Sequence, residues 1–452
     1  MNRWGWGLLV VVLACLPILA RRSTSPALLR DTDTSELLKA VRLRHSPLSW
    51  FLGDWPLQNH FYRPVVAISF EVDSAVYGDR AAGYGLTNSL LCVGCLLALF
   101  WFCAELTGSL SLSLIAAFVF ALWNIDSGAV VAPGAAWASG GIASMGLIRH
   151  GLRVRHWLPA SLCLAFLSYE LGGIAALSFR MSWWLPGRTA SLMALFALIS
   201  LASYARLERI GPDRMPPREP TATDLPATRT SGAPSQATGR EWLWALLSLA
   251  CLALALASYE QAVVLPVALL GVGLLFQLGG HRIRWPWHAA SWALLLLYLA
   301  IRKLVLPAGV SGYQLQQFRH GVTVAWSIAR YVFPASFDAR DLLFGGLSGA
   351  LLLSLEPLRQ AWAVSANVVA YLQIRRRLWV GLCAYALSVG SFLPMAWLKP
   401  FEHYHYLPMA FRALFVAVLA AVCFDLSVTA VSPRARQAPP RPSPAPGSLL
   451  RP

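Results

Sequence analysis

Charged residues are scarce in this chain of 452 residues. Asp, Glu, Lys and Arg make up 13% of it, against about a quarter in globular proteins. Hydrophobic residues make up 57%, and the mean hydropathy is +0.55. This balance excludes a soluble globular protein. Apolar runs long enough to cross a hydrocarbon core of about 30 Å recur, and helices satisfy their own backbone in lipid. The sequence therefore predicts an all-α, polytopic transmembrane helical bundle.

The chain also lacks several familiar frameworks. Its eight cysteines fall inside apolar segments, without the spacing of a disulfide framework or a metal site. No glycine motif of the Rossmann type is present. The chain has 21 acidic and 37 basic residues, which gives a net charge of +16. The arginines are scattered, however, and form no basic stripe that would contact the phosphates of a nucleic acid. A nucleic-acid partner is therefore excluded, and the excess indicates membrane topology and contact with lipids.

Apolar and polar stretches alternate along the chain and predict about 11 to 13 spans. The predicted segments are a first transmembrane helix (1–20), a long extracytoplasmic loop with short amphipathic helices (21–83), transmembrane helices (84–205), a disordered cytoplasmic linker (206–241), transmembrane helices (242–306), a second extracytoplasmic loop (307–341), transmembrane helices (342–427) and a disordered cytoplasmic tail (428–452). Residues 342–377 fit one span or two. A signal peptide is the alternative for residues 1–20, although Ile18-Leu19-Ala20 is a poor cleavage site.

Basic residues set the expected orientation. Short loops holding Arg282, Arg284 and 375–377, together with the linker and the tail, are expected on the cytoplasmic side. The first loop then faces outward. We expect a multi-pass protein of a bacterial cytoplasmic membrane, with its functional face directed outside.

Residues 26–88 form the most unusual stretch, because they are polar, charged and aromatic between apolar spans. Asp31 and Asp33 lie near the outer end of the first span, where a low-dielectric boundary raises a carboxyl pKa and suits a general base. The alternative is helix capping by Asp33 or Thr34. Asp54, in Gly53-Asp54-Trp55-Pro56, is either a supporting residue of a site or a turn residue.

Arginine in Tyr62-Arg63-Pro64 offers a donor fork that matches phosphate oxygens. A snorkelling interfacial arginine is the equal alternative. Ionisable residues inside a membrane are functional candidates, and Glu260 is the clearest one. The segment 402–408 holds Glu402, His403, Tyr404 and His405. It lacks a convincing third metal ligand, so a polar lining for a sugar or a phosphate is the better interpretation.

Five ordered motifs carry a resemblance to a known family. They are Asp31-Thr32-Asp33, Tyr62-Arg63-Pro64-Val65 with the later Gly83-Tyr84-Gly85-Leu86-Thr87-Asn88, Trp184-Leu185-Pro186-Gly187-Arg188, Ser258-Tyr259-Glu260 with Pro266, and Glu402-His403-Tyr404-His405-Tyr406-Leu407-Pro408. Together they resemble the GT-C superfamily of membrane glycosyltransferases, and within it the protein O-mannosyltransferase-like group that includes the transmembrane and tetratricopeptide-repeat mannosyltransferases. Three positions depart from the pattern: Tyr259 replaces a lysine, His403 an arginine and Cys92 a histidine. No tetratricopeptide repeats follow.

The resemblance implies an inverting transfer of a sugar, mannose by family default, from a polyprenyl-phosphate donor to a hydroxyl of a protein, lipid or glycan. It implies Asp31 or Asp33 as the base and Arg63, His403 and His405 as ligands of the donor phosphate. The supporting residues that it implies are Asp54, Tyr62, Asn88, Glu260, Glu402 and Tyr404. Some members use a divalent metal ion, and no ligand set in this chain requires one.

Two alternatives stand beside this prediction. A transporter or lipid flippase would place Glu170 and Glu260 along a central pathway. An inactive scaffold would keep the GT-C fold after losing the two cations now replaced by Tyr259 and His403. A glycosyltransferase instead predicts that Asp31 or Asp33, Arg63 and Glu402 line one outward cavity.

Overall fold

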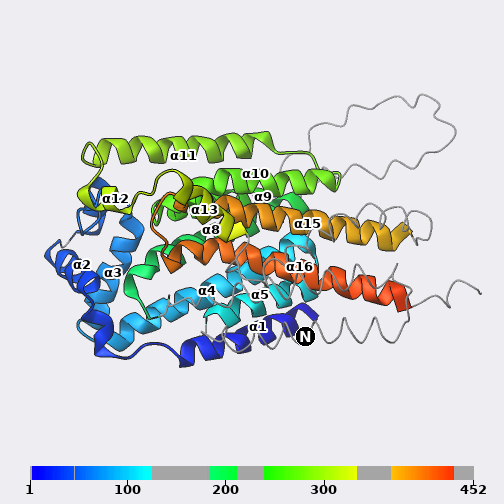
Figure 1. Cartoon of the computed structure of the whole chain (residues 1–452), viewed down its shortest axis with the longest axis horizontal. Coiled ribbons are helices and arrows are strands. Elements are labelled where there is room, and N and C mark those ends of the chain that lie inside the picture. The colour runs from blue at the N-terminus through cyan, green and yellow to red at the C-terminus, as the bar shows by residue number, and fades with distance from the viewer. Residues whose placement is uncertain are drawn as a thin grey trace, which may run out of the picture.

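The computed structural model describes residues 3–44, 46–124, 181, 183–210, 239–332 and 368–431. In these ranges every regular element is a helix, and the sole β-type pairing is an isolated bridge between Phe318 and Leu398. The long helices lie side by side as a bundle, and the short helices of the first loop gather at one end of it (Figure 1). The architecture is therefore a helical bundle.

Nine apolar helices form the bundle in the described ranges. They are α1 (Arg3–Ala20), α4 (Ala81–Thr107), α5 (Leu110–Asn124), α8 (Arg188–Ile210), α9 (Gly239–Leu256), α10 (Leu265–Leu278), α11 (Trp285–Val305), α15 (Val368–Phe392) and α16 (Tyr406–Val431). Six of them, α4, α8, α10, α11, α15 and α16, belong to segments long and apolar enough to cross a membrane, and the other three are shorter. The chain is a multi-pass integral membrane protein.

Predicted and observed boundaries differ at several helix ends. The disordered linker was expected from residue 206, but α8 continues to Ile210, and α9 begins at Gly239. Helix α16 likewise continues to Val431, beyond the expected end at 427. Parts of the expected transmembrane segments 84–205 and 342–427, namely 125–180, 182 and 342–367, lie outside the described residues.

The buried fraction of each helix shows whether it lies at the centre or at the edge of the bundle. The apolar segment containing α8 is 78% buried, so this helix is central, whereas the segment of α11 is 22% buried and forms an edge. Large leucines on α11, such as Leu296 and Leu297, are exposed. In a membrane such side chains face lipid. Helix α4 ends at Gly108, whose φ of +68° is the left-handed conformation that favours glycine at a helix C-terminus.

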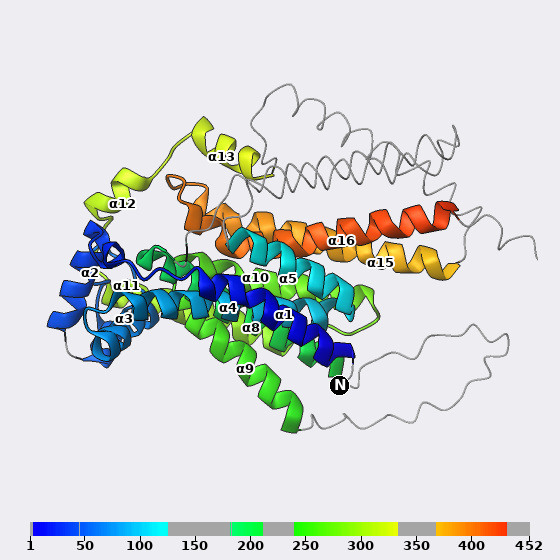
Figure 2. The same cartoon turned by 90° about the horizontal axis from the view of Figure 1, so that it is seen from below.

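A cap of short elements covers one end of the bundle (Figures 1 and 2). The first loop supplies α2 (Thr32–Leu43) and α3 (Pro64–Tyr77), with 3-10 turns at Pro26–Leu29 and Pro47–Leu52. These pack through their own apolar core, which includes Leu37, Trp50 and Phe70. The second loop supplies α12 (Gly312–Gln317) at this end, and it continues into α13 (Val322–Val332), which lies beside α15 (Figure 2). The cap is where the predicted site residues gather.

Candidate functional site

Hydrogen bonds join three distant segments into the cap. The Ser311 hydroxyl donates to the Asn59 carbonyl (3.1 Å), and the Gln314 amide donates to the His60 carbonyl (3.1 Å). Farther on, the Arg319 N–H donates to the Trp397 carbonyl over 2.7 Å. The first loop, the second loop and the segment before Glu402 are thus held together. This brings the motifs at 62–65 and 402–408 to the same end of the bundle.

Arg63 and Glu260 form an ion pair in this cap. Both Nε and Nη2 of Arg63 donate to Glu260 Oε2, at 2.9 and 2.7 Å. Pro64 starts α3 directly after Arg63, and the Val65 N–H donates to the Ala257 carbonyl (3.2 Å), so the backbone at this point is fixed against the end of α9. Burial would lower the pKa of Arg63, but the Glu260 carboxylate outweighs it, so the pKa is raised and the guanidinium stays charged.

Aromatic rings enclose this ion pair. The Arg63 guanidinium carbon lies 4.1 Å from the ring centroid of Phe61, 4.6 Å from that of Tyr259 and 5.7 Å from that of Trp55. Such contacts hold a cation in one place. Arg63 Nη1 makes no hydrogen bond in the described part of the chain, and Glu260 Oε1 is buried without a partner there. The ion pair thus keeps one unused donor, on Arg63, and one unused acceptor, on Glu260.

The 402–405 segment lies against the same rings. Tyr259 stacks on Tyr404 (centroids 6.4 Å apart) and contacts His403 (6.0 Å). Gln261 holds Tyr404 in place against Tyr259, because its amide nitrogen donates to the Tyr404 carbonyl over 2.9 Å. Tyr259 and His403, two of the three positions at which the sequence motifs depart from the pattern that they resemble, therefore contact each other.

His405 points elsewhere. Its ring contacts those of Phe392 (5.0 Å) and Tyr331 (5.4 Å), which stack directly on each other at 4.2 Å. His403, and not His405, is the histidine whose ring contacts Tyr259. No group of three potential metal ligands occurs within the ranges that the structure describes.

A cavity of about 1380 Å³ opens beside His403 and Glu402. Asp31 and Glu402 supply its carboxylates, and Arg21 and Arg22 supply its cations. The remaining lining residues are Ser23, Thr24, Ser25, Ala27, Leu28, Thr34, Asn124, Met181, Trp183, Trp184, Leu185, Pro400, Phe401 and His403. The mixture of charge, hydroxyl groups and indole faces suits a polar ligand that also carries an apolar part.

Asp31 and Asp33 are placed differently. Asp31 is the N-cap residue of α2, but its side chain makes no capping hydrogen bond, so its carboxylate is available to the cavity it lines. Asp33 does not line that cavity. Its charge instead affects Tyr313. Burial and the Asp33 charge raise the pKa of the Tyr313 hydroxyl, and the opposing effect of Arg63 is smaller. Partial burial and the carboxylates of Asp31 and Glu36 raise the pKa of Asp33.

Asp54 and Tyr62 hold the loop that presents Arg63. The Asp54 carboxylate accepts three backbone N–H groups, from Trp55 (2.7 Å), His60 (2.9 Å) and Phe61 (2.9 Å). The Tyr62 hydroxyl donates to the Phe51 carbonyl over 3.1 Å. Asp54 thus organises the turn before Arg63, as the turn interpretation of its motif expects.

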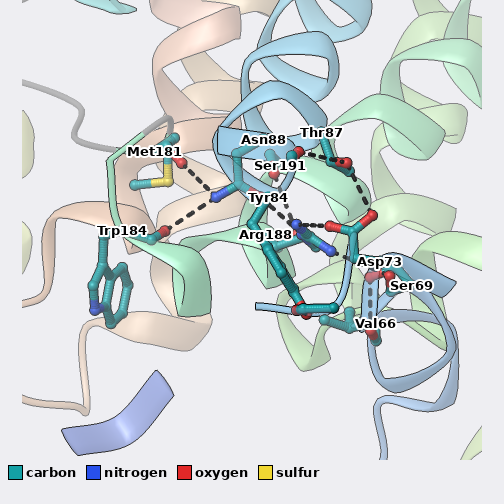
Figure 3. A network of polar contacts seen from close by, with 12 residues as sticks. Val66, Ser69, Asp73, Tyr84, Thr87, Asn88, Met181, Trp184, Arg188 and Ser191 are labelled. Atoms are coloured by element: carbon teal, nitrogen blue, oxygen red, sulfur yellow. Dashed lines mark hydrogen bonds and ion pairs between the residues drawn. The ribbon is translucent and has the colours of Figure 1, made fainter. Parts of the chain in front are cut away.

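Asn88 belongs to a buried network shown in Figure 3. Arg188 donates through Nη2 to Asp73 Oδ2 (2.6 Å) and through Nε to Asn88 Oδ1 (2.8 Å). The Asn88 amide nitrogen in turn donates to the carbonyls of Met181 (3.1 Å) and Trp184 (3.4 Å). Met181 and Trp184 line the cavity. The network therefore ties α3, α4 and α8 together behind one cavity wall.

The sequence interpretation missed several of these residues. Arg21 and Arg22 line the cavity, and the signal available was a pair of arginines directly after the first span. Asp73 has no motif around it. Asp31 or Asp33, Arg63 and Glu402 were expected to line one cavity; Asp31 and Glu402 line it, whereas Arg63 is not among its lining residues. Arg63 is separated from it by the Tyr259 and His403 rings.

Glu260 does not follow the arrangement that a transporter predicts. It lies at the start of the 3-10 turn before α10, and its carboxylate pairs with Arg63 of the first loop. Glu170, its expected counterpart, lies outside the described residues.

Comparison with known proteins identifies no relative: no family model, no curated protein and no solved structure matches this chain.

Proposed function

We propose that this protein is a GT-C-type glycosyltransferase that moves a sugar, mannose by family default, from a polyprenyl phosphate to an acceptor hydroxyl. The observation that carries the proposal is the large cavity beside the cap. It combines the Asp31 carboxylate, which makes no helix-capping hydrogen bond, with cations and indole rings. A sugar phosphate needs each of these: a base, positive charge for the phosphate, and apolar faces for the sugar ring.

The bond changes follow from these groups. Asp31 takes the proton of the acceptor hydroxyl as its oxygen forms a bond to the anomeric carbon. The bond from that carbon to the phosphate oxygen breaks on the opposite face, and the lipid phosphate leaves with the electron pair. Arg63, through its unused Nη1, is the proposed donor to the developing charge, and this role requires the Tyr259 and His403 rings between it and the cavity to move aside. The proton on Asp31 then passes to solvent through the cavity.

Orientation is part of the proposal. The short connection between α10 and α11 carries Arg282 and Arg284, at the end of the bundle opposite the cap. Basic residues in short loops favour the cytoplasm. The cap and its cavity then face outward, where a bacterial cell presents polyprenyl-phosphate sugars and its acceptors.

The test is an assay of donor consumption by the purified protein. Labelled polyprenyl-phosphate mannose, glucose and galactose are supplied with peptide and membrane-glycan acceptors, and the release of polyprenyl phosphate is measured. Asp31→Asn should lower turnover by about 10²- to 10⁴-fold, the usual contribution of a general base.

Asp33→Asn is the matched control, because it removes the same charge two residues away without altering the cavity lining. It should keep turnover within tenfold of the wild type. Release from none of the donors, or equal turnover in Asp31→Asn and the wild type, would contradict the proposal.

A further inference from the structure

A second cavity lies at the opposite end of the bundle from the cap. Its volume is about 540 Å³, and it lies where α8 and α10 end and α15 begins (Figure 1). It is lined by Leu106, Arg209, Leu275, Phe276, Leu278, Gly279, Gly280, His281, Arg375, Arg376, Trp379 and Val380. Three arginines from two helices therefore meet around one hollow.

The charge of this cavity is positive and not balanced from within. Among the residues that the structure describes, no carboxylate lines it. Arg209 bonds to Glu105 and to the Ala104 carbonyl. Arg375 and Arg376 are exposed, and neither forms an ion pair in the ranges the structure describes. Two uncompensated guanidinium groups, each with a planar donor fork, suit the oxygens of a phosphate ester.

Apart from His281 and two glycines, the rest of the wall is apolar, and part of it lies at the protein surface. Leu275 and Phe276 line the interior, while Leu278 and Trp379 are 63% and 40% exposed. Tryptophan at this depth is typical of the membrane–water interface. A ligand that fills the cavity thus has its charged part among the arginines and an apolar part running along Leu278 and Trp379.

We infer that this cavity binds the phosphate headgroup of an anionic phospholipid, with an acyl chain lying along Leu278 and Trp379. A free phosphate shares the headgroup chemistry but would leave the apolar wall uncovered. Position supports the lipid as well, because the cavity lies at the ends of three apolar helices, where headgroups are found. The inference does not depend on the proposed sugar transfer.

Binding to the purified, delipidated full-length protein tests the inference. Phosphatidylglycerol, phosphatidylcholine and inorganic phosphate are added separately, and bound molecules are counted by native mass spectrometry. One phosphatidylglycerol should bind at concentrations where phosphatidylcholine does not. Arg375→Gln and Arg376→Gln should each weaken this binding by about tenfold, or 1.4 kcal/mol. Both side chains are exposed, so the variants should fold, and their thermal unfolding reports whether they do.

Arg282→Gln is the matched control. Arg282 is an exposed arginine at the same end that does not line the cavity, and its loss should change binding by less than twofold. Equal weakening in Arg282→Gln would mean general surface attraction and would overturn the site. Equal binding of phosphatidylcholine would overturn the headgroup assignment. Displacement of the lipid by an equal concentration of inorganic phosphate would overturn the lipid as the ligand.

Discussion

Arg188 Nη2 lies 2.6 Å from Asp73 Oδ2, and the two side chains are 0% and 6% exposed. The pair joins the start of α8 to α3, elements 115 residues apart in the chain. Arg188 also packs its guanidinium over the Phe70 ring at 4.3 Å. Because Asn88 bonds to the same arginine and holds the Met181 and Trp184 carbonyls, this pair supports the cavity wall from behind.

Replacing Asp73 should therefore destabilise the whole cap. Asp73→Asn leaves the Arg188 charge buried without its counter-ion, which costs about 3–5 kcal/mol in comparable buried pairs. Thermal unfolding in detergent, followed by the loss of helical signal, measures the change.

A control for this variant is the exposed pair of Arg42 and Asp79, whose side chains are 42% and 86% exposed at a separation of 2.7 Å. Arg42→Gln should cost about 0–1 kcal/mol, as surface ion pairs do. Equal unfolding midpoints for Asp73→Asn and Arg42→Gln would show that the buried pair does not have the structural role assigned to it.

Arg63 supports a second prediction, on activity. If its free Nη1 binds the donor phosphate, Arg63→Gln should lower kcat/KM by about 10²- to 10³-fold, the usual cost of losing one donor to a developing negative charge. Arg22→Gln removes a cation from the cavity and should cost less. A larger loss in Arg22→Gln would assign the phosphate to the arginines that follow α1.

A double variant distinguishes a structural role of Arg63 from a role in phosphate binding. Arg63→Gln alone leaves Glu260, whose side chain is only 14% exposed, as a charge without its partner. Arg63→Gln combined with Glu260→Gln removes both charges and should recover the unfolding midpoint. Turnover should stay low in the double variant. Recovery of turnover together with stability would show that the pair only holds the fold.

Hydropathy was sufficient to predict the bundle, because a membrane span is specified by local composition. Nine expected spans have a helix in the described ranges, with differences at their ends such as the continuation of α8 to Ile210. The role of Asp54 was also local, since an aspartate in Gly53-Asp54-Trp55-Pro56 favours a turn.

The site depended on contacts that no local pattern encodes. Arg63 and Glu260 were both selected, yet nothing in the sequence pairs residues 197 positions apart. A buried arginine such as Arg188 requires a partner, but seven acidic residues of the first loop compete for it: Asp31, Asp33, Glu36, Asp54, Glu71, Asp73 and Asp79. Only the packing of α3 against α8 selects Asp73.

Gly85 gives a third prediction, on close packing. A Cβ atom at this position of α4 would collide with the backbone carbonyl of Ser23, in the segment that lines the cavity. Gly85→Ala should therefore displace residues 21–25, at a cost of about 1–3 kcal/mol, and lower turnover. Gly390→Ala in α15 is the control, because a Cβ there meets no atom within 4 Å. Equal unfolding midpoints and equal turnover in the two variants would contradict this role for Gly85.

Asp33 gives a prediction on pH dependence. Partial burial and the carboxylates of Asp31 and Glu36 raise its pKa above the ordinary value of 3.8. The folded protein then holds this proton more tightly than the unfolded chain does. The stability that Asp33 contributes is fully present below pH 3.8 and is lost as the pH rises through the folded-state pKa. Asp33→Asn does not titrate, so its unfolding free energy should increase relative to the wild type between pH 3.5 and pH 7.

The size of this pH effect should be small, within about 0.5 kcal/mol, because Asp33 is exposed to solvent. Denaturant unfolding of both proteins at the two pH values measures it. The Asp31 charge is one cause of the raised pKa, so the pH-dependent difference should shrink when both proteins also carry Asp31→Asn. A relative loss of stability in Asp33→Asn on going to pH 7 would mean that the folded state favours the charged carboxylate. In that case a cation, and not the neighbouring acids, would dominate the field at this position.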